Sequence, residues 1–149
     1  MRHSLGICAI VLAAAFAAAP SVRADEILDG LKALPGNVED VRIGGTWERD
    51  GKSGVYRVII SRSGGDAITA RLFIQWVAYD DTGGASVMDT EEIKEVADLN
   101  VDIVDFTSES DSSGLSVYLQ TLDPDGSDDQ NYELTVTSPK QHKFGPASN

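Results

Sequence analysis

Cysteine and histidine are almost absent from this sequence, and their scarcity limits its chemistry. Among 149 residues there is one cysteine, Cys8, and there are two histidines, His3 and His142. Cys8 lies within the predicted signal peptide, so the mature domain would have no cysteine for catalysis. A metal centre built from cysteine and histidine is excluded by their number. A serine–histidine–aspartate arrangement would depend on His142, close to the C-terminus. No glycine-rich segment has the flanking residues of a phosphate-binding loop. We predict no catalytic residue and a protein that is not an enzyme, with carboxylates as the only remaining candidate catalytic groups.

Positive charge is also scarce. Lysine and arginine number 12 against 24 aspartates and glutamates, which gives a net charge of −12. This excludes a nucleic-acid partner, because a phosphate-binding surface is built from lysine and arginine. Residues 40–77 contain six bases and four acids, whereas residues 78–133 contain one base and 16 acids. The acidic half either keeps an exported protein soluble or recognises a basic partner or a cation.

The first 24 residues predict export. A positively charged start precedes an alanine-rich apolar run, residues 5–19, and Val-Arg-Ala then precedes Asp25. This is the layout of a secretory signal peptide, and the run is shorter than the roughly 20 residues that a membrane-spanning helix requires. We predict that residues 1–24 are removed and that the mature domain is periplasmic or secreted, with no membrane span. N-terminal sequencing of the exported protein should begin at Asp25, and a Met1 start in a membrane fraction would contradict the prediction.

The rest of the sequence predicts a short helix, one β-domain and a tail. Residues 25–40 are predicted to form a short helix and a linker, because apolar side chains recur every three or four positions until Pro35. These side chains are Ile27, Leu28, Leu31 and Leu34. Residues 41–137 are predicted to form the β-domain. Residues 138–149 contain two prolines and a glycine, and predict a flexible C-terminal tail.

The β-domain is predicted from short strands separated by turns. The clearest strand, residues 68–79, alternates an apolar face with a mixed one, and Leu72, Ile74 and Trp76 are predicted core residues. Residues 86–100 fit a helix or an edge strand, and we favour a strand because their neighbours are strands. The spacing of the turns is typical of an all-β fold, mainly an antiparallel β-sandwich or a small barrel. In general architecture only, the expected sandwich is similar to immunoglobulin-like domains.

One face of the strand 68–79 is a candidate ligand-binding surface. It carries Arg71, Phe73, Gln75 and Tyr79, and Arg57 is expected on the neighbouring strand. Aromatic rings beside an arginine and an amide stack on sugars or peptides and hydrogen-bond to them. The alternative is that this face packs beneath a second sheet, the N-terminal helix or a subunit.

The segment 123–129 is a candidate calcium loop, and calcium is the only cofactor that the sequence suggests. Four aspartates offer the oxygen ligands that calcium prefers, namely Asp123, Asp125, Asp128 and Asp129. The loop departs from the usual acidic calcium loop, because its glycine comes too early and no glutamate closes it. Pro-Asp-Gly is also a turn signal, so an ordinary turn is the alternative.

These features favour recognition over catalysis. We predict an exported binding or interaction domain whose ligand is a glycan, a peptide or another protein of the cell envelope. The alternatives are a small secreted hydrolase or lyase that uses carboxylates, and an acidic inhibitor that docks into a basic cleft. Carboxylates that converge in a concave pocket would favour the enzyme, and a convex, aromatic-lined sheet would favour binding.

Overall fold

The structure, a computed structural model, describes residues 22–65, 67–127 and 129–148, with side chains from residue 26 onward. Most of the predicted signal peptide lies outside the described residues, so its cleavage stays a prediction. The chain divides into two compact units, one that ends at Leu34 and one that begins at Pro35.

The first unit contains helix α1 (Val22–Lys32). The predicted N-terminal helix is confirmed, and it begins before Asp25. Its apolar side chains are exposed, namely Ile27, Leu28, Leu31 and Leu34. In the described ranges, neither helix has the length and apolar character that crossing a membrane requires.

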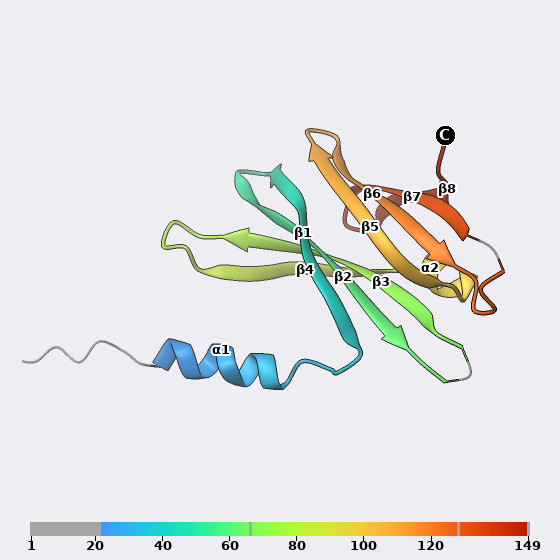
Figure 1. The fold of residues 1–149 in the computed structure, drawn as a ribbon. Helices are drawn as coiled ribbons and strands as arrows, with labels where there is room; N and C mark the ends of the chain where they lie inside the picture. Colours follow the sequence, from blue (N-terminus) through green and yellow to red (C-terminus); the bar gives the residue numbers. More distant parts are fainter. Residues whose placement is uncertain (1–21, 66, 128, 149) are drawn as a thin grey trace, which may run out of the picture. The chain divides into compact units, whose positions relative to one another are not determined.

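The second unit consists of two four-stranded antiparallel sheets (Figure 1). In each sheet the strands lie in sequence order, so each sheet is a meander of hairpins. The first sheet comprises β1 (Val38–Arg49), β2 (Lys52–Ser63), β3 (Thr69–Tyr79) and β4 (Ala85–Ile93). The second sheet comprises β5 (Asp102–Asp111), β6 (Gly114–Leu122), β7 (Asp129–Ser138) and β8 (Gln141–Pro146).

The predicted antiparallel, sandwich-like fold is confirmed. Its likeness to immunoglobulin-like domains holds for the two layers and not for the connections. Immunoglobulin sandwiches exchange strands between their sheets through Greek-key connections. Here the chain completes the first sheet, crosses through helix α2 (Lys94–Leu99) and then builds the second.

Residues 86–100 contain both of the predicted alternatives, so the preference for a strand is wrong for their second half. β4 ends at Ile93, and α2 follows directly. Ile93 and Val96 are fully buried, so the end of β4 and the first turn of α2 both contribute to the core. Asn100 ends the helix in the left-handed conformation, with φ of 55°, which asparagine tolerates better than most residues.

The C-terminal segment forms a strand, which corrects the prediction of a flexible tail over residues 138–149. β8 pairs antiparallel with β7, and the rings of Tyr132 and Phe144 stack with their centroids 5.1 Å apart. The two prolines do not prevent the strand. Pro139 lies in the turn before β8, and Pro146 is the last residue of this edge strand, where a missing N–H costs little.

The hydrophobic core lies between the two sheets. The three predicted core residues, Leu72, Ile74 and Trp76, are all buried. Inward-facing side chains alternate along β2 in the same way, as expected for a sheet with one buried face. The second sheet contributes Ile103, Phe106, Leu115, Val117, Leu119, Leu134 and Val136.

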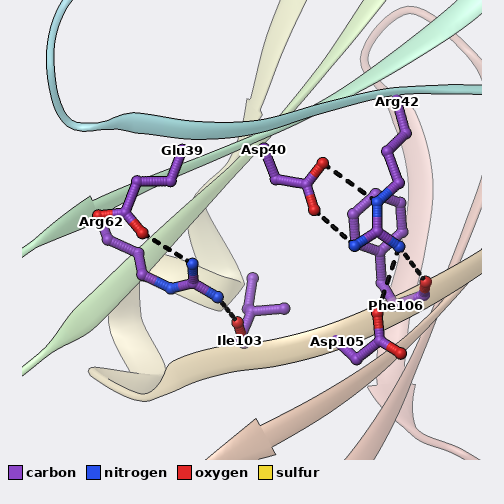
Figure 2. A network of polar contacts seen from close by, with 7 residues as sticks. All are labelled: Glu39, Asp40, Arg42, Arg62, Ile103, Asp105 and Phe106. Carbon is purple, nitrogen blue, oxygen red and sulfur yellow. Dashed lines mark hydrogen bonds and ion pairs between the residues drawn. The ribbon is translucent and has the colours of Figure 1, made fainter.

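Arg42 of β1 reaches across to β5, an edge strand of the second sheet (Figure 2). Its Nη1 donates to Asp105 Oδ1 at 3.2 Å and to the carbonyl oxygen of Phe106 at 3.0 Å. The guanidinium carbon lies 4.3 Å from the centre of the Phe106 ring, and Asp40 holds the guanidinium from its own strand. An edge strand presents carbonyl groups with no ladder partner, and this arginine satisfies one of them.

Arg62 of β2 makes a second connection to the same strand (Figure 2). It donates to the carbonyl oxygen of Ile103, to Asp102 Oδ1 at 2.7 Å and to Glu39 Oε2 at 2.9 Å. The uneven charge of the sequence therefore has a structural use. Two bases of the early, basic half pair with acids of the later, acidic half and join the two sheets.

His142 of β8 joins the sheets on another side. Its Nδ1 lies 2.9 Å from Glu91 Oε1, and its Nε2 lies 3.1 Å from Glu95 Oε1. The backbone N–H of Lys140 also donates to Glu91, at 2.7 Å. The histidine therefore anchors β8 to β4 and α2, which the prediction of a tail did not anticipate.

Replacing His142 by phenylalanine should weaken this anchor. The pKa of Glu95 lies below its ordinary value, chiefly because of a backbone N–H and also because His142 donates to the carboxylate. A lowered pKa stabilises the fold above the ordinary range of a glutamate and loses that contribution as the pH falls through the folded-state pKa. We expect His142→Phe to raise the pKa of Glu95, followed by NMR titration, and to lower the free energy of unfolding by about 1 kcal/mol near pH 6. The exposed neighbour Lys143, changed to glutamine, is the control, and equal values in both variants would contradict the role of His142.

Candidate functional site

The predicted ligand-binding residues Arg57 and Gln75 lie together on the outer face of the first sheet. The register pairs Arg57 with Gln75 and Gln75 with Thr90. Arg57 Nη1 donates to Gln75 Oε1 at 3.1 Å, and Gln75 Nε2 donates to Thr90 Oγ1 at 3.2 Å. These cross-strand hydrogen bonds occupy some of the donors and acceptors that would otherwise be free to bind a ligand.

Arg71 and Phe73 lie on the same face and also have partners. Arg71 Nε donates to Glu92 Oε1 at 2.7 Å, and its guanidinium carbon lies 5.2 Å from the centre of the Phe73 ring. The pKa of Glu92 is lowered, chiefly because Arg71 donates to its carboxylate. Such cross-strand pairs stabilise a sheet. Ligand binding by this face stays a prediction.

The predicted calcium loop contains the ordinary turn that the sequence offered as the alternative to a calcium site. Gly126 N–H donates to the Asp123 carbonyl at 2.8 Å, and Ser127 N–H donates to Asp125 Oδ1 at 2.9 Å. Asp128 lies outside the described residues, and Asp129 begins β7. Across the described ranges, no three histidine, cysteine, aspartate or glutamate side chains are grouped to hold a metal ion. Calcium binding therefore stays a prediction.

A groove of about 1210 Å³ opens at the end of the second unit where the β1–β2, β5–β6 and β7–β8 hairpins turn. We call it the end groove. Its aromatic side chains are Trp47, Tyr56, Trp76 and Tyr79. Its charged side chains are Glu48, Arg49, Asp50, Lys52, Asp89 and Asp111. Of the five predicted ligand-binding residues, Tyr79 is the one that lines this groove, and its side chain is half exposed.

Local sequence shapes the rim of the end groove. Asp50 and Gly51 both have positive φ, 52° and 72°, and Arg49 pairs directly with Lys52. Asp-Gly favours such a two-residue turn, because glycine and aspartate tolerate this conformation. The tight turn places the two cations side by side at the rim.

A second turn of the rim fixes Asp111. Asp111 Oδ1 accepts from Ser113 N–H at 2.7 Å and from the Ser113 hydroxyl at 2.6 Å. The pKa of Asp111 lies below its ordinary value, because the Ser113 hydroxyl and N–H both stabilise the carboxylate. A carboxyl that acts as a general acid needs a shift in the opposite direction. Asp111 is therefore suited to accept hydrogen bonds rather than to release a proton.

Arg49 connects the two sheets across the end groove. Its Nη2 donates to the carbonyl oxygen of Thr137 in β7, at 3.0 Å. Burial raises the pKa of Tyr56, and the positive charge of Arg49 partly opposes that shift. Trp47 Nε1 donates to the carbonyl oxygen of Val55 at 3.0 Å, so this indole is satisfied within the protein.

Trp76 has a buried hydrogen-bond donor with no partner. Its side chain is 3% exposed, lines the end groove and packs edge-on against Tyr56, with ring centroids 6.0 Å apart. Among the described residues, Trp76 Nε1 is the one buried side-chain nitrogen or oxygen that forms no hydrogen bond. Native proteins pair nearly all such groups, because a buried, unsatisfied donor costs about 1–3 kcal/mol. Trp76 therefore brings to the groove lining a buried donor whose need for an acceptor the described chain does not meet.

Comparison with protein-family models, with curated proteins and with solved structures gives no match to this chain. The candidate site is therefore judged on its own chemistry.

Proposed function

We propose that this chain is an exported, non-enzymatic binding domain of the cell envelope or exterior, and that its ligand lies in the end groove. The unpartnered N–H of Trp76 carries the proposal. Aromatic side chains and a few convergent polar groups in a concave site are the usual composition of a binding pocket. The volume of the groove, about 1210 Å³, suits an extended ligand rather than a small metabolite.

The groove supports binding better than the outer face of the first sheet. On that face Arg57, Gln75 and Arg71 already have partners within the sheet. Trp76, which lines the groove, has a buried Nε1 with no hydrogen-bond partner in the described chain. Because Nε1 is buried, a ligand oxygen reaches it only after neighbouring side chains shift, as interface side chains commonly do on binding.

A hydrolase or lyase is the second candidate, because four carboxylates line the same groove. Acid–base catalysis by carboxylates needs one group that holds its proton near neutral pH. The pKa of Asp111 is lowered rather than raised, because Ser113 stabilises its ionised form. This observation argues against Asp111 as the general acid of such an enzyme.

The proposal is tested by the variant Trp76→Phe. The probes are a neutral hexasaccharide, a basic hexapeptide, an acidic hexapeptide and a fatty acid, each titrated by calorimetry. Trp47 and Trp76 are the two tryptophans of the chain and both line the groove, so wild-type tryptophan fluorescence reports its occupancy independently. We expect at least one probe to bind, and Trp76→Phe to weaken it tenfold or more, because the lost hydrogen bond is worth about 1–3 kcal/mol.

Phe73→Ser is the matched control, because Phe73 belongs to the same strand and lies on the outer face. It should bind the probe as the wild type does. Trp76→Phe should keep a free energy of unfolding within about 1 kcal/mol of the wild type, because it removes an unsatisfied donor together with some apolar surface. Binding that survives Trp76→Phe and is lost in Phe73→Ser would move the site to the outer face.

A further inference from the structure

We infer that the end groove binds a neutral oligosaccharide, an inference that rests on the proposed function. It follows from three features of the lining: its charge, its hydrogen-bonding groups and its aromatic side chains.

The charge of the lining disfavours an anionic ligand. Four carboxylates, those of Glu48, Asp50, Asp89 and Asp111, line the groove together with two cations, Arg49 and Lys52. Arg49 also donates to the carbonyl oxygen of Thr137, so part of its donor capacity is used. A sulfated, phosphorylated or carboxylated ligand would meet net repulsion.

The hydrogen-bonding groups call for a ligand that both donates and accepts. Carboxylates only accept, so they need donors from the ligand, whereas Trp76 Nε1 only donates and needs an oxygen. A hydroxyl group donates one hydrogen bond and accepts two, and a sugar carries several on each ring. A fatty acid or another apolar molecule would leave most of these groups unpaired, at a cost for each.

The aromatic side chains of the lining match the apolar, C–H face of a sugar ring. Tyr79 is half exposed and Trp47 is partly buried, so both present ring surface at the groove, with Tyr56 and Trp76 deeper in it. The face of an aromatic ring is negative, and it attracts the slightly positive C–H groups that line one side of a sugar ring. Rings and carboxylates together therefore suit a flat, polyhydroxylated ligand.

A peptide fits less well. Peptides commonly bind as an added strand along a sheet edge, and such a strand needs a regular edge. Three edge strands border the groove, namely β1, β4 and β5, and none has a regular register with its neighbour. The pairing of β4 with β3, for example, shifts between Trp76 and Val77, next to Met88. A bulge of this kind interrupts the row of backbone groups that a peptide would pair with.

The test is calorimetric titration of the full mature protein with hexasaccharides of glucose, mannose and N-acetylglucosamine, in α- and β-linked forms. A sulfated hexasaccharide and a basic hexapeptide are the comparisons. We expect at least one neutral sugar to bind. Tyr79→Ala and Trp76→Phe should each weaken that binding tenfold or more, and Phe73→Ser should leave it unchanged. The sulfated form of the same sugar should bind at least tenfold more weakly.

The other possible outcomes show whether the inferred ligand, the proposed function or both are wrong. If the peptide or the sulfated sugar binds instead, and Trp76→Phe weakens that binding, the inference of a neutral sugar is wrong. The proposed binding function in the end groove is then retained. Release of new reducing ends from a bound neutral sugar would uphold the ligand class and overturn the non-enzymatic function. Absence of binding by every probe, in a protein shown to be folded, would overturn both.

Discussion

Replacing Trp76 by alanine is expected to lower the free energy of unfolding by about 3–5 kcal/mol, the usual range for removing a large buried ring from a core. The side chain is 3% exposed and belongs to the core cluster that joins the two sheets. Its removal leaves Tyr56 without the ring against which it packs. The cost should lie near the lower end of the range, because alanine also removes the unsatisfied Nε1 donor.

Urea unfolding followed by circular dichroism measures this effect, with the slope of the transition checked for constancy. Tyr79→Ala is the matched control, because Tyr79 lies in the same strand and is half exposed. It should cost about 1 kcal/mol or less, in line with surface substitutions. If Trp76→Ala unfolded at the wild-type urea concentration, Trp76 would not be part of the core, and the groove would not be built as described.

The comparison of Trp76→Ala with Trp76→Phe separates stability from binding. Alanine removes the whole ring and the donor, whereas phenylalanine keeps a six-membered ring and removes the donor with some apolar surface. If Trp76 serves a ligand, the two variants should lose binding to a similar extent and differ by several kcal/mol in stability. If Trp76 is purely structural, the same difference in stability remains, but the folded Trp76→Phe variant binds as the wild type does.

The core could be predicted from the sequence because a strand alternates its side chains with a period of two. Leu72, Ile74 and Trp76 follow that period within one uninterrupted strand. The strand at the C-terminus could not be predicted in the same way. It depends on the stacking of Phe144 on Tyr132 and on His142 between two carboxylates, and these contacts join residues that lie far apart in the sequence.

The candidate site was harder to predict than the core. The period of two correctly places Arg71, Phe73 and Gln75 on one face. Which of them are free to meet a ligand depends on β4, whose register supplies Glu92 and Thr90 as partners. The absence of a partner for an indole N–H is a property of packing, and no local pattern in a sequence reveals it.

The charge pattern, by contrast, was visible in the sequence, but its use was not. The early excess of bases and the later excess of acids suggested a basic partner or a cation. In the structure, Arg42 and Arg62 form hydrogen bonds within the molecule, to the acids and carbonyl groups of β5. The same segregation of charge therefore serves the assembly of two sheets, each of which is continuous in sequence.

Replacing Gly114 by alanine is expected to lower the free energy of unfolding by roughly 3 kcal/mol or more, because strain and overpacking add. Gly114 begins β6 with φ of 142°, a conformation that residues with a Cβ rarely adopt. An alanine Cβ would lie 2.1 Å from the carbonyl oxygen of Val136. That carbonyl belongs to β7, which is paired with β6 on one side and β8 on the other. The carbonyl can therefore move away only if backbone hydrogen bonds between these strands are distorted.

Gly126→Ala is the control for the backbone contribution. Gly126 also has positive φ, 71°, and its Cβ would meet nothing within 4 Å, so alanine should cost only about 1–2 kcal/mol there. The difference between the two variants, measured by urea unfolding, then contains the cost of the contact with Val136 and the greater backbone strain at φ of 142° than at 71°. Equal losses would mean that β7 yields without cost. Because Gly114 lines the end groove, a shift of the β5–β6 turn in this variant should also weaken hexasaccharide binding under conditions where the protein is fully folded.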